Sequence, residues 1–309
     1  DPATVVLPPY YADTPLARRD WANGLESMQI CDRQVGEVLA MIEKEGETDN
    51  TLVFLIGDNG RCHIRGKQFL YDPGLLVPVI VRWPGVVAPG QLNDDLIQTI
   101  DITATILKAA GVESVHPLHG KDLLNPDWEE RETVFAARDK MDDTHDAMRM
   151  VRSKRYKLIH NLMPERPWLQ LNKYKERMYP MLAEMNVLHM QGKLNPVQAT
   201  FFADKKPEFE LYDLQADPHE TKNLAEDPAQ AERKAEMLAE LNAWRKSIND
   251  QGVSDAFRKG GNPSTVPTRS LEEWKATVKK WEPWVFRAPD SKMSHPFAPK
   301  KVKKGKGRK

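Results

Sequence analysis

The chain has 309 residues with 45 basic and 45 acidic side chains, so its formal net charge is zero. That balance gives no electrostatic reason to expect nucleic acid or a charged membrane surface as a partner. No apolar stretch approaches the roughly 18 residues that a membrane span requires. Two cysteines, Cys31 and Cys62, supply neither a disulfide framework nor a metal-binding spacing.

The N-terminal segment begins with a Pro-rich stretch that lacks both an initiator Met and the layout of a signal peptide. We therefore expect residue 1 to lie inside a domain rather than at the natural start of the protein. Apolar residues then recur at helical spacing from Trp21 to Ile42, which predicts an amphipathic helix from about Pro15 to Glu45. Asp32 is the one ionisable residue in that stripe, and we expect it to have a structural role.

Two apolar runs follow the helix. Residues 51–56 are partly β-branched and end at a glycine, which predicts a strand buried on both faces of a parallel sheet. Residues 77–83 predict a neighbouring strand, whose direction relative to the first stays open. Asp58 and Asn59 come just past the first strand, where α/β sheets place ligand-binding groups. Their oxygens suit Ca²⁺ or Mg²⁺, and Lys67 could hold an anion beside the metal, although an Asp-Asn-Gly turn is the alternative.

The rest of the chain changes character near residue 130. Asp101 is expected to cap a helix that ends at Gly111, and the loop after it carries His116 and His119 at the surface. Sequential short strands then predict an antiparallel sheet, at residues 133–137, 147–152, 156–159 and 209–214. Helices are predicted at about 172–190, 227–248 and 271–281. We predict an α/β part at 1–130, a small antiparallel sheet plus helix subdomain at 131–250, and an extended, partly disordered basic tail at 251–309.

An ordered set of motifs resembles the second half of the catalytic domain of type I sulfatases, the formylglycine-dependent enzymes of the alkaline-phosphatase-like superfamily. The motifs are Gly57-Asp58-Asn59-Gly60, Gly66-Lys67, Leu70-Tyr71, Gly74, Val77-Pro78 and Arg82-Trp83-Pro84-Gly85. Glu210 to Leu214 and Asp217 to Glu220 similarly resemble the C-terminal subdomain of that family. The resemblance covers about residues 1–250. It implies an α/β, alkaline-phosphatase-like sulfatase fold, truncated at the N-terminus, with a small antiparallel α+β C-terminal subdomain.

The resemblance also implies roles for individual residues. Asp58 and Asn59 would ligate one Ca²⁺ ion that also grips the sulfate, and Lys67 would contact a sulfate oxygen. His63 lies between these motifs, where it could act on a leaving-group oxygen, with packing in the loop as the alternative. Arg65 could bind a substrate anion.

A second group of candidates follows a predicted strand of the antiparallel sheet. Arg138 and Asp139 resemble a run that some glycan-directed sulfatases place over the substrate pocket. Arg138 there would pair with a carboxylate or a second sulfate, and a surface salt bridge is the alternative. His145 and Arg149 are weaker candidates.

The nucleophile of these enzymes has no counterpart in this sequence. Formylglycine forms within a Cys/Ser-x-Pro/Ala-x-Arg signature, whereas Cys62 is followed by Ile64 and Gly66 at the diagnostic positions, and Cys31 by Arg33 and Val35. We therefore expect the formylglycine in a missing N-terminal half. The chain alone should be inactive, since sulfate transfer needs a nucleophile.

The resulting hypothesis is part of a calcium-dependent sulfatase that hydrolyses sulfate esters or sulfamates of a carbohydrate, in the periplasm or outside the cell. One alternative is a phosphodiester or phosphonate hydrolase of the same superfamily, although such enzymes favour His-rich two-metal sites that this sequence lacks around Asp58. The other is a non-catalytic sulfatase remnant that binds polyanions through Lys67, Arg65 and the basic tail.

Overall fold

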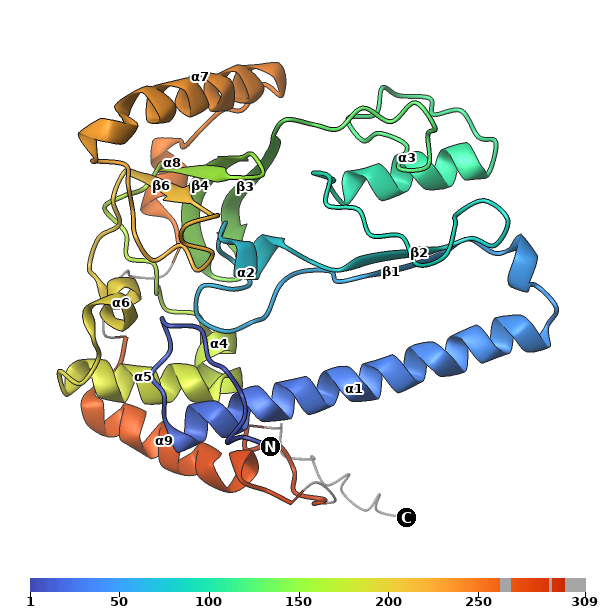
Figure 1. Ribbon diagram of the computed structural model, residues 1–309. Helices are drawn as coiled ribbons and strands as arrows, with labels where there is room; N and C mark the ends of the chain where they lie inside the picture. Colours follow the sequence, from blue (N-terminus) through green and yellow to red (C-terminus); the bar gives the residue numbers. More distant parts are fainter. Residues whose placement is uncertain (262–267, 289–290, 298–309) are drawn as a thin grey trace, which may run out of the picture.

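A computed structural model describes residues 1–261, 268–288 and 291–297, so the basic run from Lys300 to Lys309 lies outside the described residues. Within them, a long N-terminal helix and a two-stranded ribbon lie on one side, and a four-stranded sheet with several helices lies on the other (Figure 1). No described helix combines the length and the apolar character that crossing a bilayer requires.

The first half of the chain forms a long helix, a two-stranded ribbon and a second helix. Thr14 caps the first helix by accepting a hydrogen bond from the Ala17 amide, which confirms the predicted helix start. The elements are α1 (Pro15–Lys44), the 3-10 turn η1 (Thr48–Asn50), β1 (Val53–Ile56), α2 (Asp72–Leu75), β2 (Val79–Arg82) and α3 (Ile100–Ala109). The loop after α3 leaves His116 and His119 exposed, as predicted.

Strands β1 and β2 correct one expectation and confirm another. They pair with each other, as predicted, but they run antiparallel, with Val53 opposite Arg82. Neither strand is buried on both faces, and Ile56 and Ile80 are exposed. The parallel interpretation was wrong for the described residues because the chain between the strands turns back on itself through α2, so no helical crossover intervenes.

The second half of the chain is built on an antiparallel sheet, as predicted, with strand order β3-β4-β5-β6. Its strands are β3 (Val134–Met141), β4 (Thr144–Arg152), β5 (Tyr156–Asn161) and β6 (Phe209–Asp213). Successive residues point to opposite faces: Val151 and Leu158 pack against α7 (Ala231–Ser247), whereas Met150 and Ile159 join the core on the other face. The sheet is therefore covered on both sides.

Short and medium-length helices make up most of the rest of the second half of the chain. They are α4 (Lys173–Met178), α5 (Pro180–Met190), α6 (Pro196–Ala199), η2 (Thr200–Phe202), η3 (Pro228–Gln230), α8 (Asp255–Lys259) and α9 (Leu271–Val285). The single helix predicted over 172–190 is in fact two, because Pro180 lacks an amide hydrogen and Tyr179 before it adopts an extended backbone. The predicted helix at 227–248 is confirmed as η3 and α7.

The C-terminal region contains more structure than an extended tail. Helix α9 begins at a capping box formed by Ser270 and Glu273, and it buries Trp274 and Trp281 against α5 and the start of α1. The expectation of an extended segment from residue 251 was thus too broad. The predicted short helix at 271–281 is confirmed and runs to Val285.

Two acidic residues have roles that differ from those expected. Asp32 lies on an exposed stretch of α1 rather than in a buried stripe. Asp101 does not cap α3, whose N-cap is Thr99. It is fully buried instead, and its carboxylate accepts hydrogen bonds from the amides of Gln98 and Lys121 and pairs with Arg131. Asp101 therefore fastens the start of α3 to the loop that follows it.

A buried ion cluster joins the two halves of the molecule. The ammonium of Lys157, on β5, is fully buried and lies 2.6 Å from both the Asp72 carboxylate of α2 and the Glu220 carboxylate. Glu220 also accepts a hydrogen bond from the Asp72 amide, and Arg152 pairs with Asp72 at 3.0 Å. The segment between β1 and β2 is thereby held to the antiparallel sheet.

Replacing Lys157 with Met should lower the free energy of unfolding by about 3–5 kcal/mol, because it leaves two buried carboxylates short of a cation. Urea unfolding of the full chain measures this loss. Lys154→Met is the matched control, since Lys154 on the adjacent turn forms an exposed ion pair with Glu130, whose loss should change stability far less. Similar losses for the two variants would contradict the assigned importance of the Lys157 cluster.

Candidate functional site

The compact segment between β1 and β2, residues 57–78, carries most of the predicted site residues, and we call it the site loop. Two glycines permit its close backbone contacts: a Cβ on Gly60 would lie 1.8 Å from the Pro73 carbonyl oxygen, and one on Gly66 would lie 1.8 Å from that of Arg61. The Lys67 amide donates to the Arg61 carbonyl at 2.7 Å. Only glycine fits at these two positions, so the loop conformation is fixed by close packing.

Asp58 and Asn59 lie just past the end of β1, as predicted. The Asn59 side-chain amide donates to the Asp58 carboxylate at 2.5 Å. That hydrogen bond lowers the pKa of Asp58, and the positive charge of Lys67 lowers it further. The Asp58 carboxylate is therefore ionised at neutral pH, and the Lys67 ammonium lies near enough to interact with it.

The oxygen atoms of this pair fit a hard divalent cation. Asn59 Oδ1 is buried yet has no hydrogen-bond partner among the described residues, while the amide nitrogen of the same side chain donates to Asp58. An orphaned amide oxygen beside an ionised carboxylate is the donor set that Ca²⁺ uses. Among the described residues, no group of three or more His, Cys, Asp and Glu side chains could hold a metal. These two residues would thus supply only part of a coordination shell.

His63 lies in an aromatic environment beneath the same loop. Its Nε2 is 3.4 Å from a carboxylate oxygen of Asp20 on α1. Its ring lies 5.6 Å from that of Trp21 and 5.9 Å from that of Tyr179, centroid to centroid. The other ring nitrogen, Nδ1, is buried without a partner in the described part of the chain. Packing therefore accounts for most of this side chain, and a catalytic role for His63 stays a prediction.

Arg65 is buried among aromatic rings rather than presented to a ligand. Its guanidinium lies over the Tyr71 ring, 4.1 Å from the centroid, and donates to the Glu220 carbonyl oxygen at 2.6 Å. Its backbone is left-handed, with φ of 67°. These contacts explain Arg65 as a link between the loop and the C-terminal subdomain. They lend no support to the predicted substrate-binding role.

Arg138 and Asp139 are not paired with each other. Arg138, on β3, is buried and lies 3.3 Å from the Asp146 carboxylate, whereas Asp139 is half exposed and pairs with Arg149 at 2.7 Å. Arg138 is therefore in a buried ion pair rather than in the surface salt bridge of the alternative interpretation. Arg138 Nε and Nη2 are buried and have no hydrogen-bond partner in the described part of the chain, so they remain able to donate to an anion.

Lys175 is a buried cation next to the predicted site that sequence reasoning missed. It lies on α4, and its ammonium donates to the Lys67 carbonyl oxygen at 2.8 Å. Burial lowers its pKa to about 7, and the nearby charge of Arg138 acts in the same direction. The sequence offers no signal for it, since Lys175 is 108 residues from Lys67. Gln68, which follows Lys67, has a left-handed backbone with φ of 92°.

Comparison with known proteins gives one family match. Residues 60–201 match the family model described as N-sulphoglucosamine sulphohydrolase, C-terminal. The matched range begins in the site loop at Gly60 and ends in η2 at Phe201. It therefore covers Lys67 together with the Lys175 helix and most of the antiparallel sheet.

Individual relatives agree with that match. The chain is 36% identical over 245 residues to an ulvan-active sulfatase of Formosa agariphila, covering 79% of this chain and 41% of the relative. It is 29% identical over 278 residues to the human N-sulphoglucosamine sulphohydrolase, covering 82% and 53%. A solved structure of a 2-O GAG sulfatase superposes with a TM-score of 0.57 at 21% identity, covering 88% of this chain and 57% of that one. The chain thus spans about half the length of these relatives.

The low pKa of Lys175 predicts how stability changes with pH. Between about pH 7 and pH 10 the unfolded chain holds a proton on this residue that the folded chain has lost. Stability therefore rises with pH across this window, by at most about 1.4 kcal/mol per unit from this one group. Urea unfolding at several pH values should show a smaller rise in Lys175→Met than in the wild type. Lys173→Met, at an exposed neighbouring position, should retain the wild-type slope, and an unchanged slope in Lys175→Met would refute the assignment.

Proposed function

The chain belongs to the type I sulfatase family, in the C-terminal region that the family model describes, and from that premise we propose that it is part of a calcium-dependent sulfatase. The observation that carries this proposal is the orphaned Asn59 oxygen beside the ionised Asp58, with the charge of Lys67 close to both. The substrate would be a sulfate ester or sulfamate of a carbohydrate, which agrees with the ulvan-active and N-sulphoglucosamine-directed activities named for its relatives.

Asp58 and Asn59 would hold the cation through one carboxylate and one amide oxygen. A bound Ca²⁺ would spread the negative charge of the transferring sulfuryl group. Lys67 would bind a sulfate oxygen with its ammonium. Hydrogen bonds of its backbone to Arg61 and Lys175 would hold the base of that side chain in place. The chain's own contribution would thus be to bind and orient the sulfate group.

The nucleophile would come from outside these 309 residues. Neither cysteine lies in the formylglycine signature. Exposed apolar side chains support the proposal that this side of the molecule packs against a further part of the domain. Four of them are each more than half exposed, namely Met28, Val38 and Met41 of α1 and Ile80 of β2. None of the hydrophobic clusters among the described residues includes β1, β2 or α3. The N-terminal half of the sulfatase domain would pack there and complete the active site. By resemblance, the complete protein would act in the periplasm or outside the cell.

The purified chain should show no turnover of aryl or sugar sulfates, because it lacks a nucleophile for the covalent step. Turnover should appear when the upstream half is restored. Lys67→Ala should then lower it by roughly two to three orders of magnitude, the usual loss on removing one group that stabilises developing negative charge. Lys44→Ala, at the exposed end of α1, is the control and should retain full activity. Turnover by the present chain that Cys62→Ala abolishes would refute the proposal.

Calcium binding offers a test that does not depend on turnover. The isolated chain should bind Ca²⁺ weakly, with a Kd of about a millimolar or higher, because Asp58 and Asn59 supply two of the roughly six to eight oxygens that the ion takes. Isothermal titration calorimetry measures this affinity. Restoring the upstream half should tighten it, and Asp58→Asn should weaken the tightened binding. Tight binding by the present chain alone would mean that other residues complete the shell.

A further inference from the structure

The peptide group that follows Lys67 has a conformation that its sequence disfavours. Gln68 has a φ of 92°, in the left-handed region that favours glycine. A residue with a side chain costs free energy there, so the conformation persists only where its surroundings hold it. The φ of Gln68 and the ψ of Lys67 together orient the Lys67 carbonyl group. A contact to that carbonyl oxygen would therefore hold the site loop in its strained form.

Lys175, on α4, makes this contact. Its ammonium donates a hydrogen bond to the Lys67 carbonyl oxygen at 2.8 Å and lies 4.9 Å from the centroid of the Phe69 ring. Burial lowers the pKa of Lys175 to about 7, so placing an amine here costs free energy. An apolar side chain of similar length would pack at this position without that cost. The hydrogen bond to Lys67 is what the amine supplies and a hydrocarbon would not.

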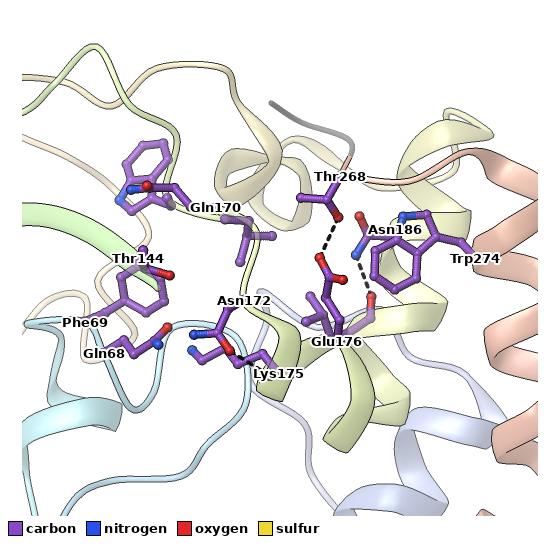
Figure 2. Close-up of a pocket in the computed structure, with 13 residues that line it drawn as sticks. Gln68, Phe69, Thr144, Gln170, Asn172, Lys175, Glu176, Asn186, Thr268 and Trp274 are labelled. Carbon is purple, nitrogen blue, oxygen red and sulfur yellow. Dashed lines mark hydrogen bonds between the residues drawn. The ribbon is translucent and has the colours of Figure 1, made fainter. Parts of the chain in front are cut away.

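The next residue on α4, Glu176, ties this helix to the segment that leads into α9. Its buried carboxylate accepts hydrogen bonds from the Thr268 hydroxyl at 2.8 Å and from Nε and Nη2 of Arg269 at 3.0 and 2.7 Å. Figure 2 shows the Glu176 side chain directed toward Thr268, whereas the Lys175 side chain is directed toward Gln68. Helix α4 thus connects the C-terminal segment to the site loop.

The start of α4 is fixed as well. The Asn172 side chain accepts a hydrogen bond from the Lys175 amide at 2.9 Å and donates one to the Asp142 carboxylate at 3.0 Å. Helix α4 has only six residues, too few to be stable without tertiary contacts. Its position therefore depends on the turn between β3 and β4 at its start and on the segment before α9 at Glu176.

We propose that Lys175 is a positioning residue for Lys67. Its hydrogen bond would hold the strained peptide group between Lys67 and Gln68, and so orient the residue whose ammonium binds the sulfate. Arg269, through Glu176, would keep Lys175 in place, so that a residue 202 positions after Lys67 in the chain contributes to its orientation. The sulfate-binding role of Lys67 rests on the proposed function, whereas the restraint on the site loop does not.

Hydrogen–deuterium exchange of the full chain tests this restraint without any turnover, by mass spectrometry of peptides that cover residues 61–70. Lys175→Met should lower the protection of these amides about tenfold and Arg269→Gln about threefold, because each weakens the contacts that hold the loop closed. Peptides that cover β5 should keep their protection. Lys275→Gln is the control and should change nothing, since Lys275 forms an exposed ion pair on α9.

A glycine at position 68 separates the proposed restraint from simple packing. Glycine adopts a φ of 92° without the cost that glutamine has, so Gln68→Gly should restore at least threefold of the protection that Lys175→Met loses, after correction for intrinsic exchange rates. A role of Lys175 in packing alone would not respond to that substitution. Unchanged protection in Lys175→Met, an equal loss in β5, or no recovery with Gln68→Gly would each overturn the proposal.

Turnover of the protein restored with its upstream half tests the positioning role itself. Lys175→Met should lower kcat/KM about tenfold where Lys67 is present and less than twofold in a Lys67→Ala background, because no ammonium is then left to position. Gln68→Gly should recover most of the loss. Equal losses in the two backgrounds would refute the positioning role. If the loop amides respond as expected but the restored protein shows no turnover, the proposed function fails and the restraint on the loop stands.

Discussion

The ammonium of Lys157 has no exposed surface, and its charge must be neutralised inside the protein. Asp72 lies in the site loop, which carries the predicted sulfate site, and Glu220 lies in the turn after β6. The same turn accepts a hydrogen bond from Arg65. A buried charge tolerates little displacement of its partners, so the site loop and the antiparallel sheet are constrained to one relative position. The placement of Lys67 thus depends on a sheet that begins more than 60 residues later in the chain.

Hydrogen bonds among buried side chains extend this constraint. The Tyr71 hydroxyl donates to Glu210 at 2.6 Å, and the Tyr212 hydroxyl donates to the same carboxylate at 2.7 Å. Asn161 donates to the other oxygen of Glu210. This burial and the neighbouring carboxylate raise the pKa values of both tyrosines well above their usual range, so they remain neutral donors. Tyr71 of the site loop is thereby linked through Glu210 to strands β5 and β6.

Local patterns predicted much of the fold, and the errors have identifiable physical causes. Sequential short strands predicted the antiparallel sheet, and successive residues of these strands, such as Met150 and Val151, join separate cores on its two faces. The apolar run at 53–56 suggested a parallel, doubly covered strand, but apolar composition alone does not specify a partner strand's direction. A single helix was predicted across Pro180 because the apolar pattern continues through it, whereas the proline divides that segment into two helices.

The candidate site divides in the same way. Asp58, Asn59 and Lys67 could be predicted since they belong to one short stretch whose motif resembles a family. Lys175 could not, because its proximity to Lys67 arises only from tertiary packing. Arg65 resembled a ligand-binding residue in sequence, yet its neighbours in space are aromatic rings.

The exposed apolar side of α1 has a practical consequence for handling the protein. Met28, Val38 and Met41 would be exposed to water over a helix of 30 residues, and β1 and β2 form a ribbon of only two strands. Exposed apolar patches and short unprotected strand edges both promote self-association. The polypeptide made on its own should therefore aggregate as its concentration increases and depend on chaperones during expression. Expression together with the upstream half that would cover this surface should reduce that self-association.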